Sequence, residues 1–254
     1  MKNIKWLFFD IGGTLADETK SLHRRAELTA KLQNKMGIHC STEQIEEAMK
    51  KAALMGLPYF QGAVKLLGLK SMVPYDAVGE KLYGDVKTVL EALCGKYKLG
   101  IIANQPLGTE GRLKHYGIRD YFSVILSSEE EGISKPDPEL FRRALERAGC
   151  APESAWMIGD RPDNDIAPAK ALGMRTVRVR QGLGGLMPVT SEEMRADHTV
   201  DSLTELLKIF ECERLVAFLT KQCRRVEGTH KKYAAFFDEF TVLSSHTKVR
   251  GYEL

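Results

Sequence analysis

Short, continuously apolar runs recur along the chain and dominate its pattern of hydrophobic and polar positions. Such runs lack the alternation of a half-exposed strand and are typical of strands buried on both faces of a parallel sheet. The pattern predicts five strands, at Ile4–Phe9, Leu99–Ala103, Ser123–Leu126, Ala155–Ile158 and Thr176–Val179.

Amphipathic helices are predicted between these strands. The apolar residues between Val86 and Leu93 recur at helical spacing. A further helix begins after Asp137, which can cap its N-terminus, with Pro138 at the first helical position, and it ends at Gly149. This alternation of strand and helix predicts an α/β fold with a doubly wound, Rossmann-like parallel sheet.

Residues 17–83 break the alternation, because they hold no convincing strand. Leu28, Leu32 and Met36 recur at helical spacing, and the Ser41–Gln44 segment forms a capping box ahead of another helix. We therefore predict three parts: an α/β core from residues 1–16 and 84–210, a small inserted helical cap from residues 17–83, and a C-terminal appendix, helical in part, from residues 211–254.

Composition excludes several classes of protein. The formal net charge of +3 is too close to neutral to indicate binding to nucleic acid or to an anionic membrane surface. No apolar stretch approaches the ~20 residues of a membrane helix, and the N-terminus leads into a predicted strand rather than a signal peptide. The five cysteines form no CxxC pair, so neither a disulfide framework nor a zinc site is indicated. A cytoplasmic protein is expected.

Three of the predicted strands are followed by polar side chains, at Asp10, Asn104 and Asp160. In open α/β sheets, ligands bind beyond the carboxyl ends of the strands, so we expect these side chains to converge. Two carboxylates in one crevice repel each other, and an oxygen-binding cation such as Mg²⁺ relieves that repulsion. The sequence therefore predicts a magnesium site.

The residues around these positions suit phosphoryl transfer. Asp10 begins the sequence Asp-Ile-Gly-Gly-Thr, whose glycines permit a sharp turn before the hydroxyl of Thr14. Lys135 lies on a loop stiffened by two prolines, and Asp165 follows the strand that leads to Asp160. A carboxylate nucleophile, a metal and a lysine together can position a phosphoryl group and neutralise its charge.

In these motifs the chain resembles the haloacid dehalogenase-like hydrolase superfamily, in the subclass with a helical cap inserted after the first strand. The resemblance covers residues 4–210. The family's four motifs are DxDxT, a Ser or Thr after an apolar strand, a lysine, and GDxxxxD. In this sequence they fall on Asp10, Gly12 and Thr14; on Ala103; on Lys135; and on Gly159, Asp160 and Asp165.

The resemblance implies a role for each matched position. Asp10 would attack phosphorus and form an aspartyl-phosphate, while Lys135 would neutralise charge and Asp165 would hold Lys135 or a metal-bound water. The implied catalytic residues are Asp10, Lys135 and Asp165; the implied Mg²⁺ ligands are Asp10, the backbone carbonyl of Gly12, and Asp160; and the implied phosphate-binding residues are Thr14 and Asn104.

Two positions depart from the family pattern. In family phosphatases the second Asp of the first motif protonates the leaving group and then activates water, and Gly12 can do neither. Such acid–base help typically contributes ~10²–10⁴ in rate. Ala103 lacks the hydroxyl that would bind phosphate. We therefore expect a Mg²⁺-dependent phosphohydrolase that is slow or recruits an acid from its cap, and we expect Gly12→Asp to raise turnover on poor leaving groups.

Two alternatives stay open. Relatives that cleave carbon–halogen or carbon–phosphorus bonds also replace this Asp, and the phosphonate hydrolases need a cap lysine, for which Lys50, Lys51 and Lys65 are candidates. Otherwise the site is a non-catalytic remnant that binds metal and phosphate, and the protein acts through partners. The expected substrate is a small phosphorylated metabolite, and residues 211–254 leave room for a homodimer or a protein partner.

Overall fold

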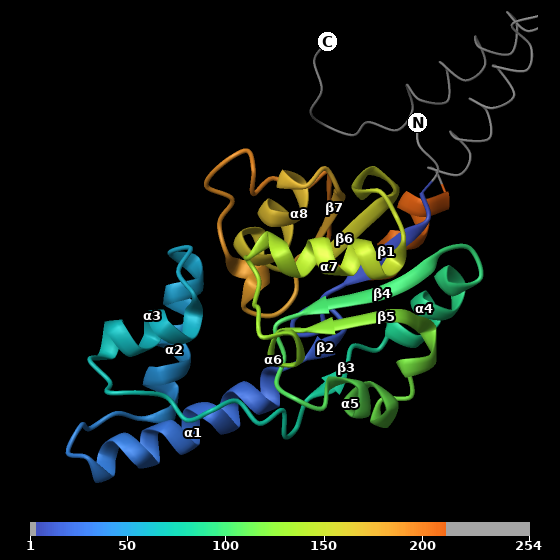
Figure 1. Cartoon of the computed structure of the whole chain (residues 1–254). Coiled ribbons are helices and arrows are strands. Elements are labelled where there is room, and N and C mark those ends of the chain that lie inside the picture. Colours follow the sequence, from blue (N-terminus) through green and yellow to red (C-terminus); the bar gives the residue numbers. More distant parts are fainter. Residues whose placement is uncertain (1–3, 212–254) are drawn as a thin grey trace, which may run out of the picture. The chain divides into compact units, whose positions relative to one another are not determined.

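The computed structural model describes residues 4–211 of the 254-residue chain. The predicted C-terminal appendix, residues 211–254, therefore lies outside the described residues except for Glu211. The described residues up to Phe210 belong to one compact unit. It contains a parallel sheet with helices on both faces, and a group of three further helices (Figure 1).

The sheet has six strands in the order β5-β4-β1-β6-β7-β8, and every neighbouring pair is parallel. This arrangement confirms the predicted α/β fold. All five predicted strands are present, and β8 was not predicted, since three residues are too few for a sequence pattern. The strands are β1 (Trp6–Phe9), β4 (Lys98–Ala103), β5 (Phe122–Ser127), β6 (Ala155–Gly159), β7 (Arg175–Val179) and β8 (His198–Val200).

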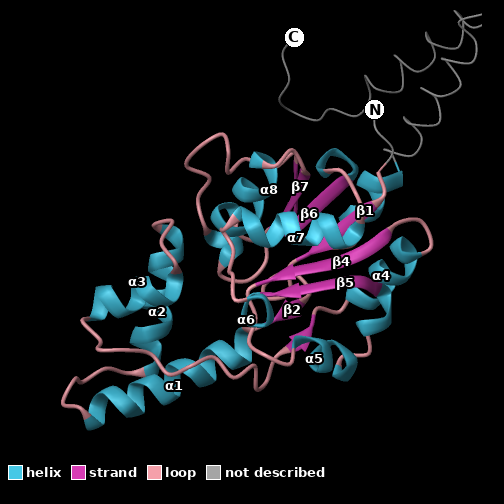
Figure 2. Cartoon of the chain, in the orientation of Figure 1, coloured by secondary structure: helices cyan, strands magenta, loops and turns pink. Residues whose placement is uncertain are grey.

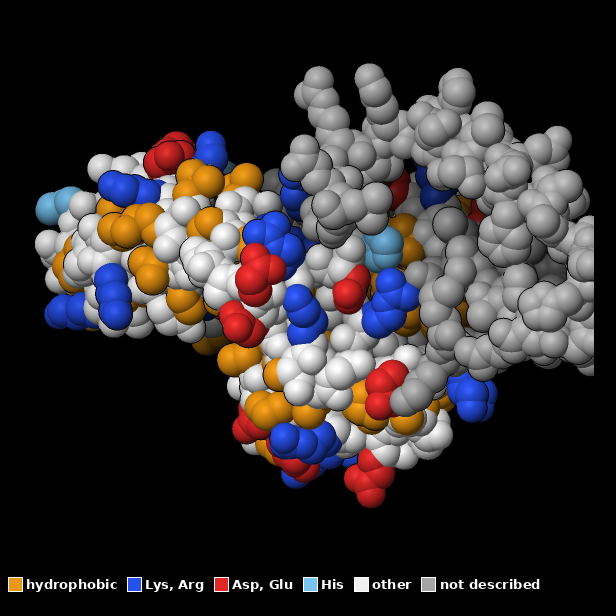
Figure 3. All heavy atoms as spheres, turned by 90° about the horizontal axis from the view of Figure 1, so that it is seen from above, with side chains coloured by type: hydrophobic (Ala, Val, Ile, Leu, Met, Phe, Trp, Pro, Cys, Tyr) orange, Lys and Arg blue, Asp and Glu red, His pale blue; other side chains and the backbone are white. Residues whose placement is uncertain are grey.

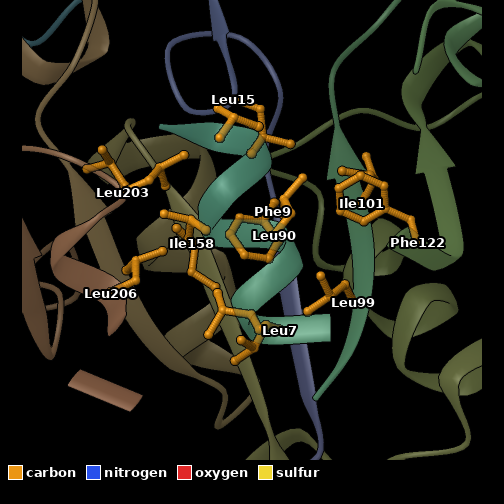
Figure 4. Close-up of a cluster of buried hydrophobic side chains, with 14 of the residues drawn as sticks. Leu7, Phe9, Leu15, Leu90, Leu99, Ile101, Phe122, Ile158, Leu203 and Leu206 are labelled. Atoms are coloured by element: carbon orange, nitrogen blue, oxygen red, sulfur yellow. The ribbon is translucent and has the colours of Figure 1, made fainter. Parts of the chain in front are cut away.

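Helices cover both faces of the sheet, so the neighbouring inner strands β1 and β6 are apolar and buried along their whole length. Leu7 and Phe9 of β1 point into one buried cluster, together with side chains of α4 (Val86–Cys94) and α5 (Thr109–His115) (Figure 4). The alternate residues Trp6 and Phe8 join a second cluster with α7 (Pro138–Ala148) and α8 (Ala167–Ala171). Each fully buried large apolar side chain contributes about 1.5–3 kcal/mol relative to exposure.

The helix boundaries of α7 follow the predicted capping residues. The side chain of Asp137 accepts a hydrogen bond from the amide of Glu139, Pro138 is the first helical residue, and Gly149 ends the helix in the left-handed conformation. The shorter elements are α6 (Ser128–Glu131), a π-helical turn at Pro162–Ile166, and 3₁₀ turns at Arg119–Tyr121, Pro152–Ser154 and Gly184–Leu186.

Three helices follow the first strand: α1 (Thr19–Lys35), α2 (Thr42–Leu54) and α3 (Tyr59–Leu67). They lie beside the sheet and bury an apolar cluster of their own (Figure 2). The predicted capping box of α2 is confirmed, because the amide of Gln44 donates to Ser41 Oγ at 3.2 Å and the amide of Ser41 donates to Gln44 Oε1 at 2.9 Å.

The helix predicted from the spacing of Leu28, Leu32 and Met36 is present as α1, with Met36 as its C-cap residue. Leu32 and Met36 are 38% and 41% exposed, whereas Leu22, Ala26 and Ala30 are buried against the neighbouring helices. These buried residues follow an i, i+4 spacing, and two of them are alanines, which allow a close approach of α1 to α2.

Two short strands at the ends of the inserted segment also contradict the sequence pattern, which indicated none. β2 (Ala16–Asp17) pairs antiparallel with β3 (Lys81–Leu82). Elements of two residues are too short to show alternation. Their pairing brings the two ends of the inserted segment together beside the loop that follows β1.

None of the helices within residues 4–211 is long and apolar enough to cross a membrane. On the face drawn in Figure 3, the described residues carry blue and red side chains interspersed with apolar ones. Mixed charge of this kind agrees with the small net charge of the chain.

Candidate active site

The loop after β1 places Asp10 at the centre of the sheet edge. The Asp10 amide donates to the Ile158 carbonyl of β6 at 2.9 Å, and the chain then turns sharply, with the Leu15 amide donating to the Ile11 carbonyl at 2.8 Å. Gly13 has a φ of +67°, and a Cβ built there would lie 2.5 Å from Asp160 Oδ2. Gly13 is therefore required both for the turn and for the close approach of Asp160.

Lys135 is buried between two carboxylates. Its Nζ lies 2.9 Å from Asp10 Oδ1 and 2.6 Å from Asp165 Oδ1. Asn104 fixes the lysine's backbone, because Asn104 Oδ1 accepts from the Lys135 amide at 2.7 Å and Asn104 Nδ2 donates to the Lys135 carbonyl at 2.8 Å. The structure thus brings the three predicted catalytic residues into direct contact, and Asn104 holds one of them.

The pKa values of Lys135, Asp10 and Asp160 are all raised, which favours the charged form of the lysine and the neutral form of the two carboxyl groups. Burial opposes charge on Lys135, but Asp10 and Asp165 outweigh it and raise its pKa. Burial raises the pKa of Asp10 to about 6 despite the nearby lysine. Burial, with the charges of Asp165 and Asp10, raises the pKa of Asp160 well above its usual value. One lysine cannot neutralise three carboxylates at this edge.

A divalent cation fits this excess of negative charge. Asp10, Asp160 and Asp165 each offer a carboxylate oxygen, and these oxygens lie within 4.8 Å of one another. Asp160 Oδ1 is buried and has no hydrogen-bond partner among the described residues. Asp165 is already committed to Lys135 and, through Oδ2, to the Arg161 amide at 2.9 Å. Asp10 and Asp160 are therefore the carboxylates open to a metal, and hard oxygen ligands suit Mg²⁺.

The residues expected to bind phosphate lie beside this cluster. Thr14 is fully buried, and its Oγ1 has no hydrogen-bond partner within the described part of the chain. The side chain of Asn104 is used to hold Lys135, which leaves its backbone amide as the group available to a phosphate oxygen. Ala103 ends β4 without a hydroxyl.

A family model described as haloacid dehalogenase-like hydrolase matches residues 4–173. The chain belongs to this family. It is 29% identical to glyceraldehyde 3-phosphate phosphatase of Pyrococcus furiosus over 231 residues, which cover 84% of this chain and 95% of that protein. The crystal structure of a HAD phosphatase from Thermococcus onnurineus has 28% identity and a TM-score of 0.61, covering 82% of this chain and 98% of the other.

A second solved structure shows how far the fold extends beyond one reaction. The 2-haloacid dehalogenase of Pseudomonas syringae pv. tomato has 24% identity and a TM-score of 0.55, covering 82% of this chain and 98% of the other. At that identity the likeness shows the fold alone. The reaction of this haloacid dehalogenase-like hydrolase must therefore be argued from its own side chains.

Sequence analysis missed Glu18, which lies beside the cluster at the start of α1. Glu18 is partly buried, and its burial, reinforced by the charge of Glu80, raises its pKa to about 7, although a hydrogen bond with Tyr75 opposes this shift. A signal existed in the sequence: once position 12 is a glycine, the next carboxyl groups along the chain are Asp17 and Glu18.

Arg178 was also missed, because it lies within a predicted strand. Its buried guanidinium donates to the Asp160 carbonyl at 3.2 Å and to carbonyls of the following loop, including that of Met187 at 2.7 Å. Arg178 therefore ties residues 184–187 to the Asp160 loop.

A cavity of about 430 Å³ opens from the cluster toward the inserted helices. Its lining is mixed, with apolar and aromatic side chains beside several acidic ones. The lining residues include Gly13, Glu18, Asp160, Met49 and Tyr59, together with Glu43, Glu46 and Glu47 of α2. Of the three lysines named from the sequence, Lys50 is among the lining residues. The cavity has the size of a small-metabolite site.

Proposed function

We propose that this protein is a Mg²⁺-dependent phosphatase that transfers the phosphoryl group of a small phosphorylated metabolite to Asp10 and then to water. One observation carries the proposal: the buried contact of Lys135 with Asp10 and Asp165, beside the unpartnered Oδ1 of Asp160. A carboxylate nucleophile needs nearby positive charge when a phosphate dianion approaches, and this arrangement supports both a lysine and a metal in that place.

The residues divide the work as follows. A carboxylate oxygen of Asp10 attacks phosphorus and forms the aspartyl-phosphate while the bond to the leaving oxygen breaks. Lys135 offsets the charge of the transferring group, and Asp165 and Asn104 hold Lys135 in place. The carboxylates of Asp10 and Asp160 and the Gly12 carbonyl would hold Mg²⁺, which would supply Lewis-acid stabilisation of the phosphoryl oxygens.

The substrate class follows from the cavity and the relatives. A space of about 430 Å³ accommodates a small metabolite rather than a polymer. The Pyrococcus furiosus relative is named for its action on glyceraldehyde 3-phosphate, and the match spans nearly all of that protein. We therefore propose short-chain phosphate monoesters, including three-carbon ones, as the first substrates to examine.

The test is phosphate release from nitrophenyl phosphate and from a panel of short-chain phosphate monoesters, with Mg²⁺ and after its removal with EDTA. We expect turnover with Mg²⁺ and a loss of at least about tenfold without it, because the metal carries part of the charge stabilisation. Phosphate release from a phosphonate alone would favour the second candidate chemistry, for which Lys50 lines the cavity. No release from any compound would favour a non-catalytic phosphate-binding relative.

A further inference from the structure

The carboxyl group of Glu18 occupies the space next to Gly12 into which a longer side chain at position 12 would extend. A Cβ built on Gly12 would lie 2.7 Å from the carboxyl carbon of Glu18 and 2.7 Å from each of its oxygens. Cβ atoms do not approach other heavy atoms so closely, so an Asp at position 12 and Glu18 in its present place exclude each other. The carboxylate absent from position 12 has a counterpart six residues later, at Glu18.

Glu18 does not serve as the cap of α1, although it precedes that helix. The capping contact belongs to Asp17, whose Oδ1 accepts from the Thr19 amide at 3.0 Å, and Glu18 makes no side-chain cap. The Glu18 backbone carbonyl anchors the first turn by accepting from Ser21 Oγ at 2.9 Å. The side chain of Glu18 is thus left to point toward Gly12.

Neighbouring polar groups hold Glu18 without neutralising it. The Tyr75 hydroxyl neighbours Glu18 and lowers its pKa, lies 3.2 Å from Ser21 Oγ, and donates to Glu80 Oε2 at 3.3 Å. The nearby cation, Arg112, lies 3.8 Å from Glu80 Oε2 and donates to Gln105. Within residues 4–211, no lysine or arginine pairs directly with Glu18. Placing a carboxyl there without a cation disfavours folding, which a purely structural role does not explain.

Glu18 is also open to the space in which a substrate would lie. It lines the same cavity as Asp160 and Gly13, whereas Glu80 is not among the lining residues. Of these two neighbouring glutamates in the described chain, Glu18 is therefore the one that can reach a leaving group.

We propose that Glu18 is the general acid and base of this hydrolase, taking the place of the Asp that position 12 lacks. This role rests on the proposed phosphatase function. In the first step Asp10 forms a bond to phosphorus, the bond to the leaving oxygen breaks, and that oxygen takes a proton from Glu18. In the second step the Glu18 carboxylate takes a proton from water, whose oxygen attacks phosphorus and breaks the bond to Asp10, releasing inorganic phosphate. Asp10 is regenerated as carboxylate and Glu18 as acid.

The test compares Glu18→Gln with wild type on two substrates in Mg²⁺. Glycerol phosphate has a leaving group that needs a proton, and nitrophenyl phosphate has one that does not. We expect kcat/KM on glycerol phosphate to fall ~10²–10⁴-fold, because general acid help is lost. On nitrophenyl phosphate kcat/KM stays within about tenfold, but kcat falls, since water is no longer activated. We therefore expect a burst of one nitrophenol per enzyme molecule, during which phosphorylated Asp10 accumulates because its hydrolysis is slow.

Two further variants make the result specific. Glu27→Gln is the matched control, because Glu27 lies on helix α1, which follows Glu18, and forms an exposed pair with Lys31. This variant should leave turnover of both substrates unchanged. In a Glu18→Ala background, Gly12→Asp should restore at least part of the activity on glycerol phosphate. This double variant returns a carboxylate to the same space and keeps the role testable if Glu18→Gln does not fold.

The outcomes separate this role from the phosphatase function itself. An equal loss on both substrates without a burst, or no loss on glycerol phosphate, would overturn the role of Glu18 while the phosphatase function stands. A wild-type protein inactive on every phosphate ester would overturn the phosphatase function, and this role with it.

Discussion

Asp10→Asn is expected to lose the phosphatase activity by on the order of 10³-fold or more, because the amide cannot act as the nucleophile. Asn keeps the size of the side chain at the carboxyl end of β1, between strands that pair with it on both sides. The measurement is phosphate release from nitrophenyl phosphate in Mg²⁺, together with detection of the phosphorylated protein by mass spectrometry. Neither turnover nor phosphorylation should remain.

The same substitution is not expected to destabilise the fold. The folded-state pKa of Asp10 is raised from 3.8 to about 6, so the folded protein binds its proton more tightly than the unfolded chain does. Protonated Asp10 therefore contributes to the free energy of unfolding. This contribution is fully present below about pH 4 and is lost as pH rises through about 6. At neutral pH, removing the charge should leave Tm unchanged or raised in metal-free protein. A lower Tm would attribute the lost activity to unfolding instead, and unchanged turnover would exclude Asp10 as the nucleophile.

Much of the site could be predicted because its residues follow strands. Asp10 and Asp160 each follow a run of buried apolar residues, and the chain order alone places both at the same edge of a parallel sheet. The structure adds that β4, β1 and β6 are adjacent, which brings Asn104 to this edge as well. The position of a polar residue that follows a buried strand can therefore be predicted from the sequence, because it depends on the direction of the backbone and not on how side chains pack.

Glu18 could not be placed in the same way. It reaches the site through the tight turn after Asp10 and the pairing of β2 with β3, two elements of only two residues each. Nothing in their composition shows that the chain folds back on itself there. A Cβ at position 12 would lie 2.7 Å from the Glu18 carboxyl group, so in Gly12→Asp the Glu18 side chain has to move. That this variant raises turnover on poor leaving groups stays a prediction.

The exposed face of α1 is a second example of what pattern alone misses. The spacing of Leu28, Leu32 and Met36 predicted the helix, yet Leu32 and Met36 are exposed while Ala26 and Ala30 are buried against the neighbouring helices. Burial between closely spaced helices favours small side chains, and an apolar residue at the surface is common. Periodicity therefore identified the helix but not the face that it buries.

Lys135→Met is expected to lower both stability and activity. Removing one partner of a buried ion pair leaves uncompensated charge, which typically costs about 3–5 kcal/mol. For a protein of this size that corresponds to a fall in Tm of roughly 6–20 °C. The lysine lies 2.9 Å from Asp10 and 2.6 Å from Asp165, so its loss leaves both carboxylates without a neighbouring cation. Turnover of nitrophenyl phosphate should fall on the order of 10²–10³-fold, as for loss of one group that stabilises transition-state charge.

Lys31→Met is the matched control, because Lys31 also contacts a carboxylate at 2.6 Å, that of Glu27, but with side chains 63% and 45% exposed. Exposed pairs contribute about 0–1 kcal/mol, so this variant should melt close to wild type and keep full activity. Thermal unfolding of the three proteins, with and without Mg²⁺, is the measurement. Since Lys135→Met leaves Asp10, Asp160 and Asp165 as an unrelieved acidic cluster, Mg²⁺ should raise its Tm more than that of wild type. Equal effects of the two lysine substitutions would mean that Lys135 is not part of a charge-balanced site.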